Sequence, residues 1–279
     1  MKKLLILLLL SLGFVGSAYA DEVTDSLEEV NVRLESSYHE NGALSHKGKV
    51  KDGKKDGKWT QWYANGQIQS EANYKDGIKV NHTNYTYHEN GQIRKEEHYK
   101  DNKLDGNRTD WNENGEKTYE ENYKDGKLDG KRTWWHENGE IESEANYKDS
   151  KLDGKWTRWY ENGQIESEVN YKDGKLDGKR TWWYENGQIR REEYYKDSKL
   201  DDKRIQWYEN GQIRKEEHYK DNKQDGEVNY FSVNGEIWFM GNYKDGDLVD
   251  KTIFKYSFFT GHLKSEKKYK YGECIIGDC

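Results

Sequence analysis

The stretch WTRWYENGQIESEVNYKDGKLDG, residues Trp156 to Gly178, contains the pattern that decides the fold. Asn162-Gly163 lies between two segments of alternating aromatic, β-branched and polar residues, which is the strongest short-range signal for a β-hairpin. A second turn is predicted at residues 173–178, where two Asp-Gly pairs bracket one leucine. The stretch therefore predicts a strand, a tight turn, a second strand and a longer turn.

This pattern occurs nine times along the chain. The Asn-Gly pairs begin at Asn41, Asn65, Asn90, Asn114, Asn138, Asn162, Asn186, Asn210 and Asn234. The step between pairs is constant, except between Asn65 and Asn90, where it is one residue longer. A fixed period of this length is typical of stacked supersecondary units. We therefore predict an all-β fold, an elongated antiparallel meander of about nine 24-residue β-hairpin repeats.

Three columns of the repeat are apolar. The first lies three residues before each turn asparagine and holds Tyr38, Trp62, Tyr87, Trp111, Trp135, Trp159, Trp183, Trp207 and Phe231. The second lies two residues after each turn glycine and holds Leu44, Ile68, Ile93, Ile141, Ile165, Ile189, Ile213 and Ile237, with Lys117 as the exception. The third holds Tyr74, Tyr99, Tyr123, Tyr147, Tyr171, Tyr195, Tyr219 and Tyr243. These columns are the predicted core.

The phase of these columns selects the turn type. In a three-residue loop, with Gly163 as a left-handed bulge, Trp159 pairs with Ile165, and Trp, Ile and Tyr share one face. Burying each of these side chains contributes roughly 1.5–3 kcal/mol, more than any preference between turn types. We therefore expect the bulged turn and a ribbon about 90 Å long. The recurring leucines of the second turn are expected to fold back over the apolar face.

The chain begins with a segment typical of a secretory signal peptide. A short basic start precedes an apolar run from Leu4 to Phe14, and Ala18 and Ala20 are the small residues before a cleavage site. We predict a signal peptide at 1–20, a leader at 21–36, the repeat array at 37–271 and a C-terminal tail at 272–279. No stretch predicts a transmembrane helix. The protein is expected to be exported, to the periplasm, the cell surface or the medium.

Composition argues against two classes of ligand. The net charge is −7, or −9 without Lys2 and Lys3, and no basic run is present. Nucleic acid and anionic lipid bind through an excess of Lys and Arg, so neither is expected. The only cysteines, Cys274 and Cys279, lie in the tail. Export would allow them to form a small terminal disulfide loop, although two free thiols are the alternative.

The repeat string Y-x-N-G-Q-I-x-x-E-x-x-Y-K-D-G-K-L-D-G-K-W resembles the variant MORN repeat of bacteria. The resemblance runs from about Tyr38 to Tyr271. It implies a β-hairpin array that acts in protein or membrane-surface interactions, without a shared chemistry. Members of this family are commonly labelled as antitoxins of toxin–antitoxin systems, which would place a toxin among the candidate partners.

Neither catalysis nor metal binding is indicated. His39, His88 and His136 occupy a column that holds tyrosine in other repeats, so we interpret them as variation at a surface position. Asp pairs at a spacing of four, such as Asp125 with Asp129, could line one edge with carboxylates, but Asp-Gly is also the chemistry of tight turns. We predict no catalytic residues, no metal site and no cofactor.

The best candidate site is a set of aromatic residues on the face opposite the predicted core. Trp134 and Trp182 stand where most repeats carry a polar residue. The candidate patch comprises Trp134, His136, Trp156, Tyr160, Trp182 and Tyr184. Exposed aromatic patches commonly mark contact surfaces. Packing within the chain or against a second copy would also explain it, so a homo-oligomer is an open alternative.

The leading hypothesis is therefore an exported, non-enzymatic protein that holds a protein partner at the cell envelope or a host surface. A second hypothesis is a glycan- or cell-wall-binding module, because aromatic hairpin repeats also resemble choline- and glycan-binding arrays. A third is an antitoxin or immunity partner of a toxin.

Overall fold

The computed structural model describes residues 31–257 and 261–277, and the predicted signal peptide lies outside them. The described residues form 21 strands. The strands are β1 Val32–Tyr38, β2 Leu44–Lys51, β3 Lys54–Trp62, β4 Ile68–Lys75, β5 Ile78–Tyr87, β6 Ile93–Lys100, β7 Lys103–Trp111, β8 Lys117–Lys124, β9 Lys127–Trp135, β10 Ile141–Lys148, β11 Lys151–Trp159, β12 Ile165–Lys172, β13 Lys175–Trp183, β14 Ile189–Lys196, β15 Lys199–Trp207, β16 Ile213–Lys220, β17 Lys223–Phe231, β18 Ile237–Lys244, β19 Asp247–Tyr256, β20 Leu263–Lys270 and β21 Glu273–Ile276.

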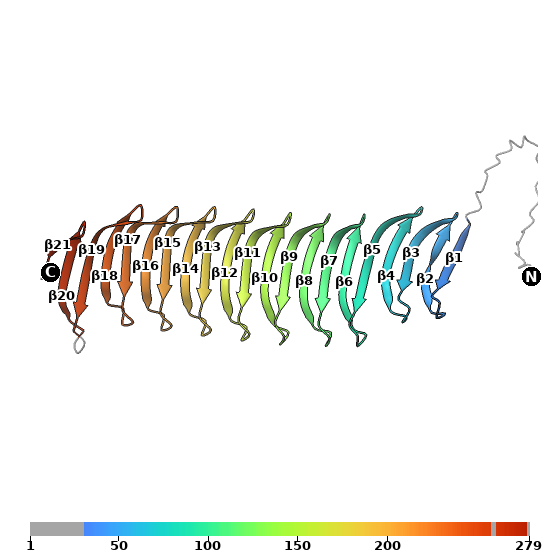
Figure 1. Cartoon of the computed structure of the whole chain (residues 1–279), viewed down its shortest axis with the longest axis horizontal. Coiled ribbons are helices and arrows are strands. Elements are labelled where there is room, and N and C mark those ends of the chain that lie inside the picture. Colours follow the sequence, from blue (N-terminus) through green and yellow to red (C-terminus); the bar gives the residue numbers. More distant parts are fainter. Residues whose placement is uncertain (1–30, 258–260, 278–279) are drawn as a thin grey trace, which may run out of the picture.

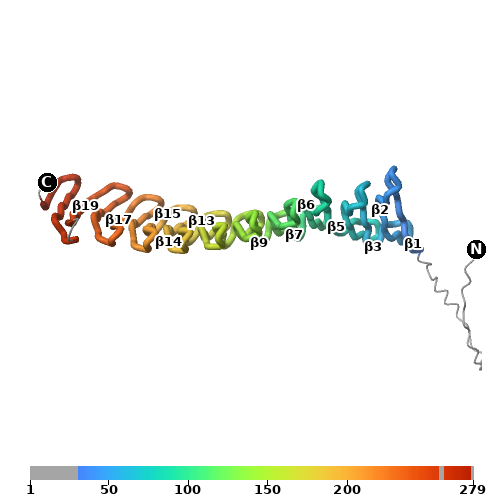
Figure 2. Tube along the Cα trace, turned by 90° about the horizontal axis from the view of Figure 1, so that it is seen from below, coloured from blue at the N-terminus to red at the C-terminus, as the bar shows by residue number. Residues whose placement is uncertain are grey.

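All described strands belong to one sheet, in which each strand pairs antiparallel with the next one along the chain. Figure 1 shows this meander as a single row of bowed strands, and Figure 2 shows the same row from below as one narrow band. The predicted all-β meander is confirmed. The sheet extends beyond the predicted array, because β1 begins inside the predicted leader and β21 lies inside the predicted tail. No helix in the described part of the chain is long and apolar enough to cross a membrane.

The Asn-Gly turns have the predicted geometry. The backbone N–H of Tyr160 donates to the carbonyl of Gln164 at 2.8 Å, and the N–H of Gly163 donates to the carbonyl of Tyr160 at 2.9 Å. Gly163 has a φ of 78°, in the left-handed region that glycine adopts without steric cost. Trp159 pairs with Ile165. The three-residue loop with a glycine bulge is therefore confirmed.

The second turn is shorter than predicted. Only Asp173 and Gly174 form the loop, both with positive φ as in a type I′ turn, and Lys172 pairs with Lys175 across it. The strand then begins at Lys175, so Leu176 is a strand residue that pairs with Tyr171. The expectation that these leucines fold back from a loop is wrong. The twist of a two-residue I′ turn matches the twist of the strands, which makes a longer loop unnecessary.

The prediction that Trp, Ile and Tyr share one face is also wrong. Trp159 pairs with Ile165, but Arg158 pairs with Ser167, which leaves Glu166 as an unpaired bulge residue. A bulge of one residue inverts the alternation of every side chain beyond it. Trp159 and Ile165 therefore lie on one side, here the isoleucine face. Tyr171 lies on the other side, here the tyrosine face.

The interior of the molecule lies along the middle of the tyrosine face. Ala145 pairs with Trp156, and Trp156 pairs with Val169. This row of residues lies two positions along the strands from the Arg158–Ser167 pair, and it is therefore on the same face. Ala145 and Val169 are buried, as is Val228 in the corresponding row of a later hairpin. The middle of the isoleucine face carries a row of buried threonines beside Lys–Glu ion pairs, such as Lys155 with Glu168 at 3.0 Å. A single layer thus buries side chains only against their neighbours on adjacent strands.

Candidate interaction surfaces

The six residues of the predicted aromatic patch lie on the tyrosine face. Trp134 and Trp182 are in one cross-strand row, which runs from Trp134 through Ser143, Arg158 and Ser167 to Trp182. Trp156 is in the neighbouring row. His136, Tyr160 and Tyr184 follow the last residue of their strands, at the Asn-Gly turns. The residues share a face as predicted, but they do not form a continuous patch.

Each tryptophan of the predicted patch has its own partners. The Trp134 ring lies 5.5 Å from the Tyr119 ring, and the Trp156 ring lies 6.2 Å from the Tyr171 ring. Trp182 lies between two guanidinium groups, with the Arg180 carbon 4.0 Å and the Arg191 carbon 3.9 Å from its centroid. All three tryptophans are half-buried. Contacts with aromatic rings and guanidinium groups stabilise such side chains, so these tryptophans contribute to the cohesion of the sheet.

The column shared by His and Tyr links each turn to the next repeat. The Tyr160 hydroxyl donates to the carbonyl of Trp183 at 2.8 Å. His136 Nε2 donates to the carbonyl of Trp159 at 3.2 Å, and His88 Nε2 makes the same bond to Trp111 at 2.8 Å. These histidines occupy a partly exposed position, but their side chains are hydrogen-bonded there, so the position has a structural role. Both His and Tyr occur in this column, because each can extend one donor to a backbone carbonyl of the following repeat.

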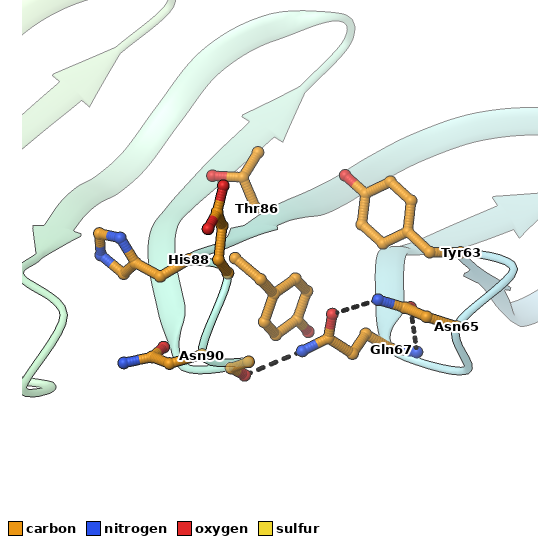
Figure 3. Close-up of a pocket in the computed structure, with 9 residues that line it drawn as sticks. Tyr63, Asn65, Gln67, Thr86, His88 and Asn90 are labelled. Atoms are coloured by element: carbon orange, nitrogen blue, oxygen red, sulfur yellow. Dashed lines mark hydrogen bonds between the residues drawn. The ribbon is translucent and has the colours of Figure 1, made fainter.

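The single longer step between repeats is accompanied by a cavity of about 600 Å³. Tyr63 contacts the Tyr87 ring at 6.3 Å, and its hydroxyl donates to the carbonyl of Tyr85. Gln67 Nε2 reaches across to the carbonyl of Gly91 at 2.8 Å, as Figure 3 shows. The amides that line this cavity are therefore hydrogen-bonded within the protein, which leaves few groups there for a ligand.

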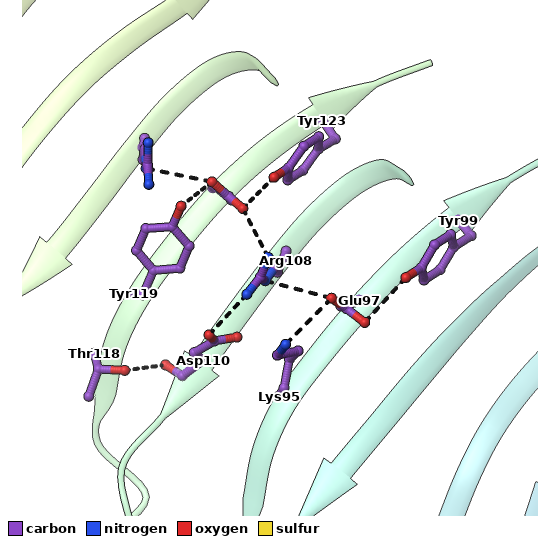
Figure 4. A network of polar contacts seen from close by, with 10 residues as sticks. Lys95, Glu97, Tyr99, Arg108, Asp110, Thr118, Tyr119 and Tyr123 are labelled. Carbon is purple, nitrogen blue, oxygen red and sulfur yellow. Dashed lines mark hydrogen bonds and ion pairs between the residues drawn. The ribbon is translucent and has the colours of Figure 1, made fainter. Parts of the chain in front are cut away.

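A chain of carboxylates and guanidinium groups runs along the middle of the tyrosine face (Figure 4). Arg108 lies between Glu97, at 3.6 Å, and Glu121, at 3.5 Å. The hydroxyl of Tyr99 donates to Glu97 at 3.2 Å, and the hydroxyl of Tyr123 donates to Glu121 at 2.5 Å. Buried charges persist only when they are paired and hydrogen-bonded, and this network supplies both conditions.

Glu217 is the most enclosed member of this set, with no exposed surface. Arg204 Nε donates to it at 2.7 Å, Lys215 Nζ lies 2.8 Å away, and the Tyr219 hydroxyl donates at 3.0 Å. Burial by itself would raise the pKa of Glu217, but the hydrogen bonds and charges of Arg204 and Lys215 outweigh it and lower the pKa. Burial, followed by the charge of Glu217, raises the pKa of Tyr219 to about 12.

The aspartates and the C-terminal cysteine have structural roles in the described part of the chain. Asp125, Asp149, Asp173 and Asp221 all have positive φ, so they are turn residues. No group of three or more potential ligands that could hold a metal ion occurs within 31–257 and 261–277. Cys274 is disulfide-bonded, whereas Cys279 lies outside the described residues, so their pairing stays a prediction.

Sequence reasoning missed an aromatic cluster at the C-terminal end of the tyrosine face. Trp238, Tyr230 and Phe239 have ring centroids 4.9–6.1 Å apart. A signal is present, because Trp238 stands in the bulge position three residues after the turn glycine. The other repeats carry Ser45, Gln69, Arg94, Thr118, Glu142, Glu166, Arg190 and Arg214 there. The importance of this column becomes visible only once the bulge is known.

The repeats match a family model, the MORN repeat variant. The matching segments are 55–76, 83–101, 104–125, 128–149, 152–173, 176–197 and 203–221. Together these segments cover more than half of the chain, and the chain therefore belongs to the MORN repeat variant family. The predicted resemblance is confirmed at this level. No curated protein matches the chain.

Solved structures share only a weak likeness with the chain. A chain of the Tc holotoxin pore of Photorhabdus luminescens is 12% identical, with a TM-score of 0.22, over 82% of this chain and 13% of that one. TcdB2-TccC3 without its hypervariable C-terminal region is 11% identical, with a TM-score of 0.23, over 87% and 17%. A porin-like protein from Bacteroides uniformis is 6% identical, with a TM-score of 0.16, over 85% and 93%. Sequence identities and TM-scores this low indicate neither the fold nor the function of this chain.

The bond between Tyr160 and Trp183 can be tested by substitution. Tyr160→Phe removes one hydrogen bond and should weaken the adjacent repeat by about 1 kcal/mol, a roughly fivefold loss of hydrogen-exchange protection in the amides around Trp183. Tyr160→His should restore part of this protection, because histidine makes the bond in other repeats. The control is Tyr194→Phe, whose hydroxyl has no hydrogen bond in the described structure. Equal protection in the two Phe variants would contradict this role.

The buried carboxylate predicts a specific response to acid. Because folding lowers the pKa of Glu217, its ionised form stabilises the fold above the ordinary value of 4.5, and this contribution is lost as the pH falls through the lowered value. Glu217→Gln should cost about 3 kcal/mol at neutral pH and should flatten the loss of stability below pH 4.5, measured as urea midpoints. Glu216→Gln, on the isoleucine face, is the control and should retain the wild-type pH profile. An unchanged acid response in Glu217→Gln would refute the assignment.

Proposed function

We propose that the protein is a non-enzymatic interaction protein whose isoleucine face binds a protein partner. One observation supports this most: a stripe of aromatic side chains along the Asn-Gly edge of that face. Its aromatic members are half-buried: Trp62, Tyr87, Trp111, Trp135, Trp159, Trp183, Trp207 and Phe231. Aromatic residues of this kind are the usual anchors of protein interfaces.

The stripe lies on an uncovered face. In the described residues each strand packs against its sequence neighbours in the sheet, and no second layer lies on the isoleucine face. Ile141, beside Trp135, has 36% of its surface exposed. Exposed apolar rows of this length are uncommon on monomeric proteins unless they bind something. A single-layer sheet therefore offers the stripe to an external partner.

The dimensions of the stripe favour an extended polypeptide. From β3 to β17 it crosses fourteen strand intervals, or roughly 70 Å at about 4.8 Å per interval. An extended segment rises about 3.3 Å per residue, so about 20 residues could follow the stripe. Repeat proteins commonly bind partners along such continuous surfaces.

The remaining chemistry also supports a binding role. The buried carboxylates Glu121 and Glu217 are hydrogen-bonded to tyrosine and paired with arginine, so they are engaged in holding the sheet together. A general base needs access to substrate, which the enclosed Glu217 does not have. The segment at residues 1–20 supports the further proposal that binding takes place outside the cytoplasm, at the cell envelope.

The proposal is tested by placing a photo-reactive amino acid at position 141, on the stripe, and in a matched variant at position 158. Arg158 is exposed in the same hairpin array but lies on the opposite face. We expect one dominant protein adduct from position 141 and none from position 158. With the purified partner, Trp135→Ala should weaken binding roughly 30-fold, as for an interface anchor.

Two results would contradict this function. The first is an equal pattern of adducts from both positions, which would indicate non-specific contact. The second is a hydrolytic activity that disappears when a single residue is changed, which would show that the protein is an enzyme.

A further inference from the structure

The tyrosine face has a pocket of about 360 Å³ between β15 and β18. Pockets that hold small ligands begin at about this size. It is lined by side chains from three successive repeats, among them Gln206, Tyr208, Arg214, Lys215, Tyr230 and Trp238. Apart from Phe231, which also belongs to the proposed protein-binding stripe, its lining residues lie on the face opposite that stripe.

One cross-strand row changes from polar to aromatic as it passes through this pocket, and its last residue, Phe239, lies outside the pocket lining. Gln206 pairs with Lys215, Lys215 with Tyr230, and Tyr230 with Phe239. The Tyr230 ring stacks on Phe239 with 4.9 Å between centroids, and the Trp238 ring lies 5.2 Å from Tyr230. Trp238 keeps 44% of its surface exposed. The result is a group of three rings, with Phe239 stacked on Tyr230 and Trp238 tilted by 51° from Tyr230, beside amide and cationic side chains.

The polar groups beside these aromatic rings are available to a ligand. In the described residues Arg214 has no carboxylate partner, and the side chains of Gln206, Tyr230 and Trp238 have no hydrogen-bond partner. Lys215 differs, because its Nζ lies 2.8 Å from Glu217 and 4.7 Å from the Tyr230 centroid. The cavity in Figure 3 provides the contrast, since its amides bond to one another and to backbone.

The position of the cation also follows from the bulge. Arg214 and Trp238 are the bulge residues of successive hairpins, so their backbones lie two strands apart, about 10 Å. The Arg214 guanidinium carbon lies 5.9 Å from the Tyr208 ring centroid. Arg214 and Tyr208 line the same pocket as Tyr230 and Trp238, so the cation and the aromatic rings face one cavity. An anion held by Arg214 would therefore leave the rest of its molecule over Tyr230 and Trp238.

We propose that this pocket binds a carbohydrate that carries a carboxylate. One face of a pyranose ring presents C–H groups, which pack against the electron-rich face of an aromatic ring. The carboxylate would accept the planar, bidentate donors of Arg214. Gln206 and the Tyr230 hydroxyl would hydrogen-bond to ring hydroxyls. A small pocket that combines aromatic rings with amide and cationic side chains suits a rigid amphipathic ring better than a flexible acidic peptide.

The test is calorimetric titration of the full protein with three probes: tetragalacturonic acid, the neutral tetrasaccharide maltotetraose, and an acidic peptide of similar length. We expect tetragalacturonic acid to bind and the other two to bind at least tenfold more weakly. Trp238→Ala should weaken binding of the acid at least tenfold. Arg214→Ala should remove the preference for the acid over the neutral sugar.

The matched control is Tyr271→Ala. Tyr271 is also an exposed aromatic residue, 75% exposed, with Lys270 Nζ 5.7 Å from its ring centroid, but it does not line the pocket. Its removal should leave binding unchanged. Circular dichroism of each variant verifies that the sheet is intact.

Three results would overturn the proposal. The first is no binding of tetragalacturonic acid at about 10 mM, a concentration above the dissociation constant of even a weak complex. The second is equal binding of the acid by wild type and Trp238→Ala, and the third is preferential binding of the peptide. Cross-linking at position 141 should be unaffected by Trp238→Ala. The two proposals can therefore fail separately.

Discussion

Every repeat of this protein depends on hydrogen bonds to the repeat that follows it. Beyond the strand ladder, the Asn-Gly edge adds a bond from Tyr160 to the carbonyl of Trp183 and one from Asn162 to the carbonyl of Glu185. At the opposite edge, the N–H of Gly174 donates to the carbonyl of Leu152. A single layer has no second sheet to pack against, so cohesion comes from nearest neighbours. This is the one-dimensional behaviour expected of repeat arrays, and it leaves both faces open.

The period and the turn chemistry of the sequence were sufficient to predict the architecture. Asn-Gly marked each hairpin, and the need to pair Trp159 with Ile165 correctly selected the three-residue loop. The two faces were assigned wrongly, because Glu166 carries no sign that it is a bulge residue. Its equivalents include Gln69, Thr118 and Arg190, which share no chemistry. Backbone geometry at this position is a consequence of sheet twist and turn closure, which residue type does not report.

The wrong assignment of the two faces also explains why the candidate surfaces were predicted only in part. Trp134, Trp156 and Trp182 do share a face, but each is half-buried against arginine or tyrosine partners. The misassigned faces had separated Trp156 from its partner Tyr171. Trp159 and its equivalents, which were predicted to form the core, lie on an uncovered face of the sheet. The bulge also places Phe239, rather than Trp238, directly opposite Tyr230. Two surfaces with different chemistry, one aliphatic and aromatic, the other aromatic and cationic, thus lie back to back on one thin sheet.

Small-angle X-ray scattering of the chain from Asn31 onward tests the central claim, that this sheet is a single open layer. Twenty strand intervals of about 4.8 Å give a ribbon roughly 95 Å long, with a radius of gyration of about 28 Å. A compact protein of the same length would have a radius of about 18 Å. The predicted result is the larger radius, measured at monomer mass. The smaller radius, or a dimer mass, would show that the faces are covered and would contradict the account.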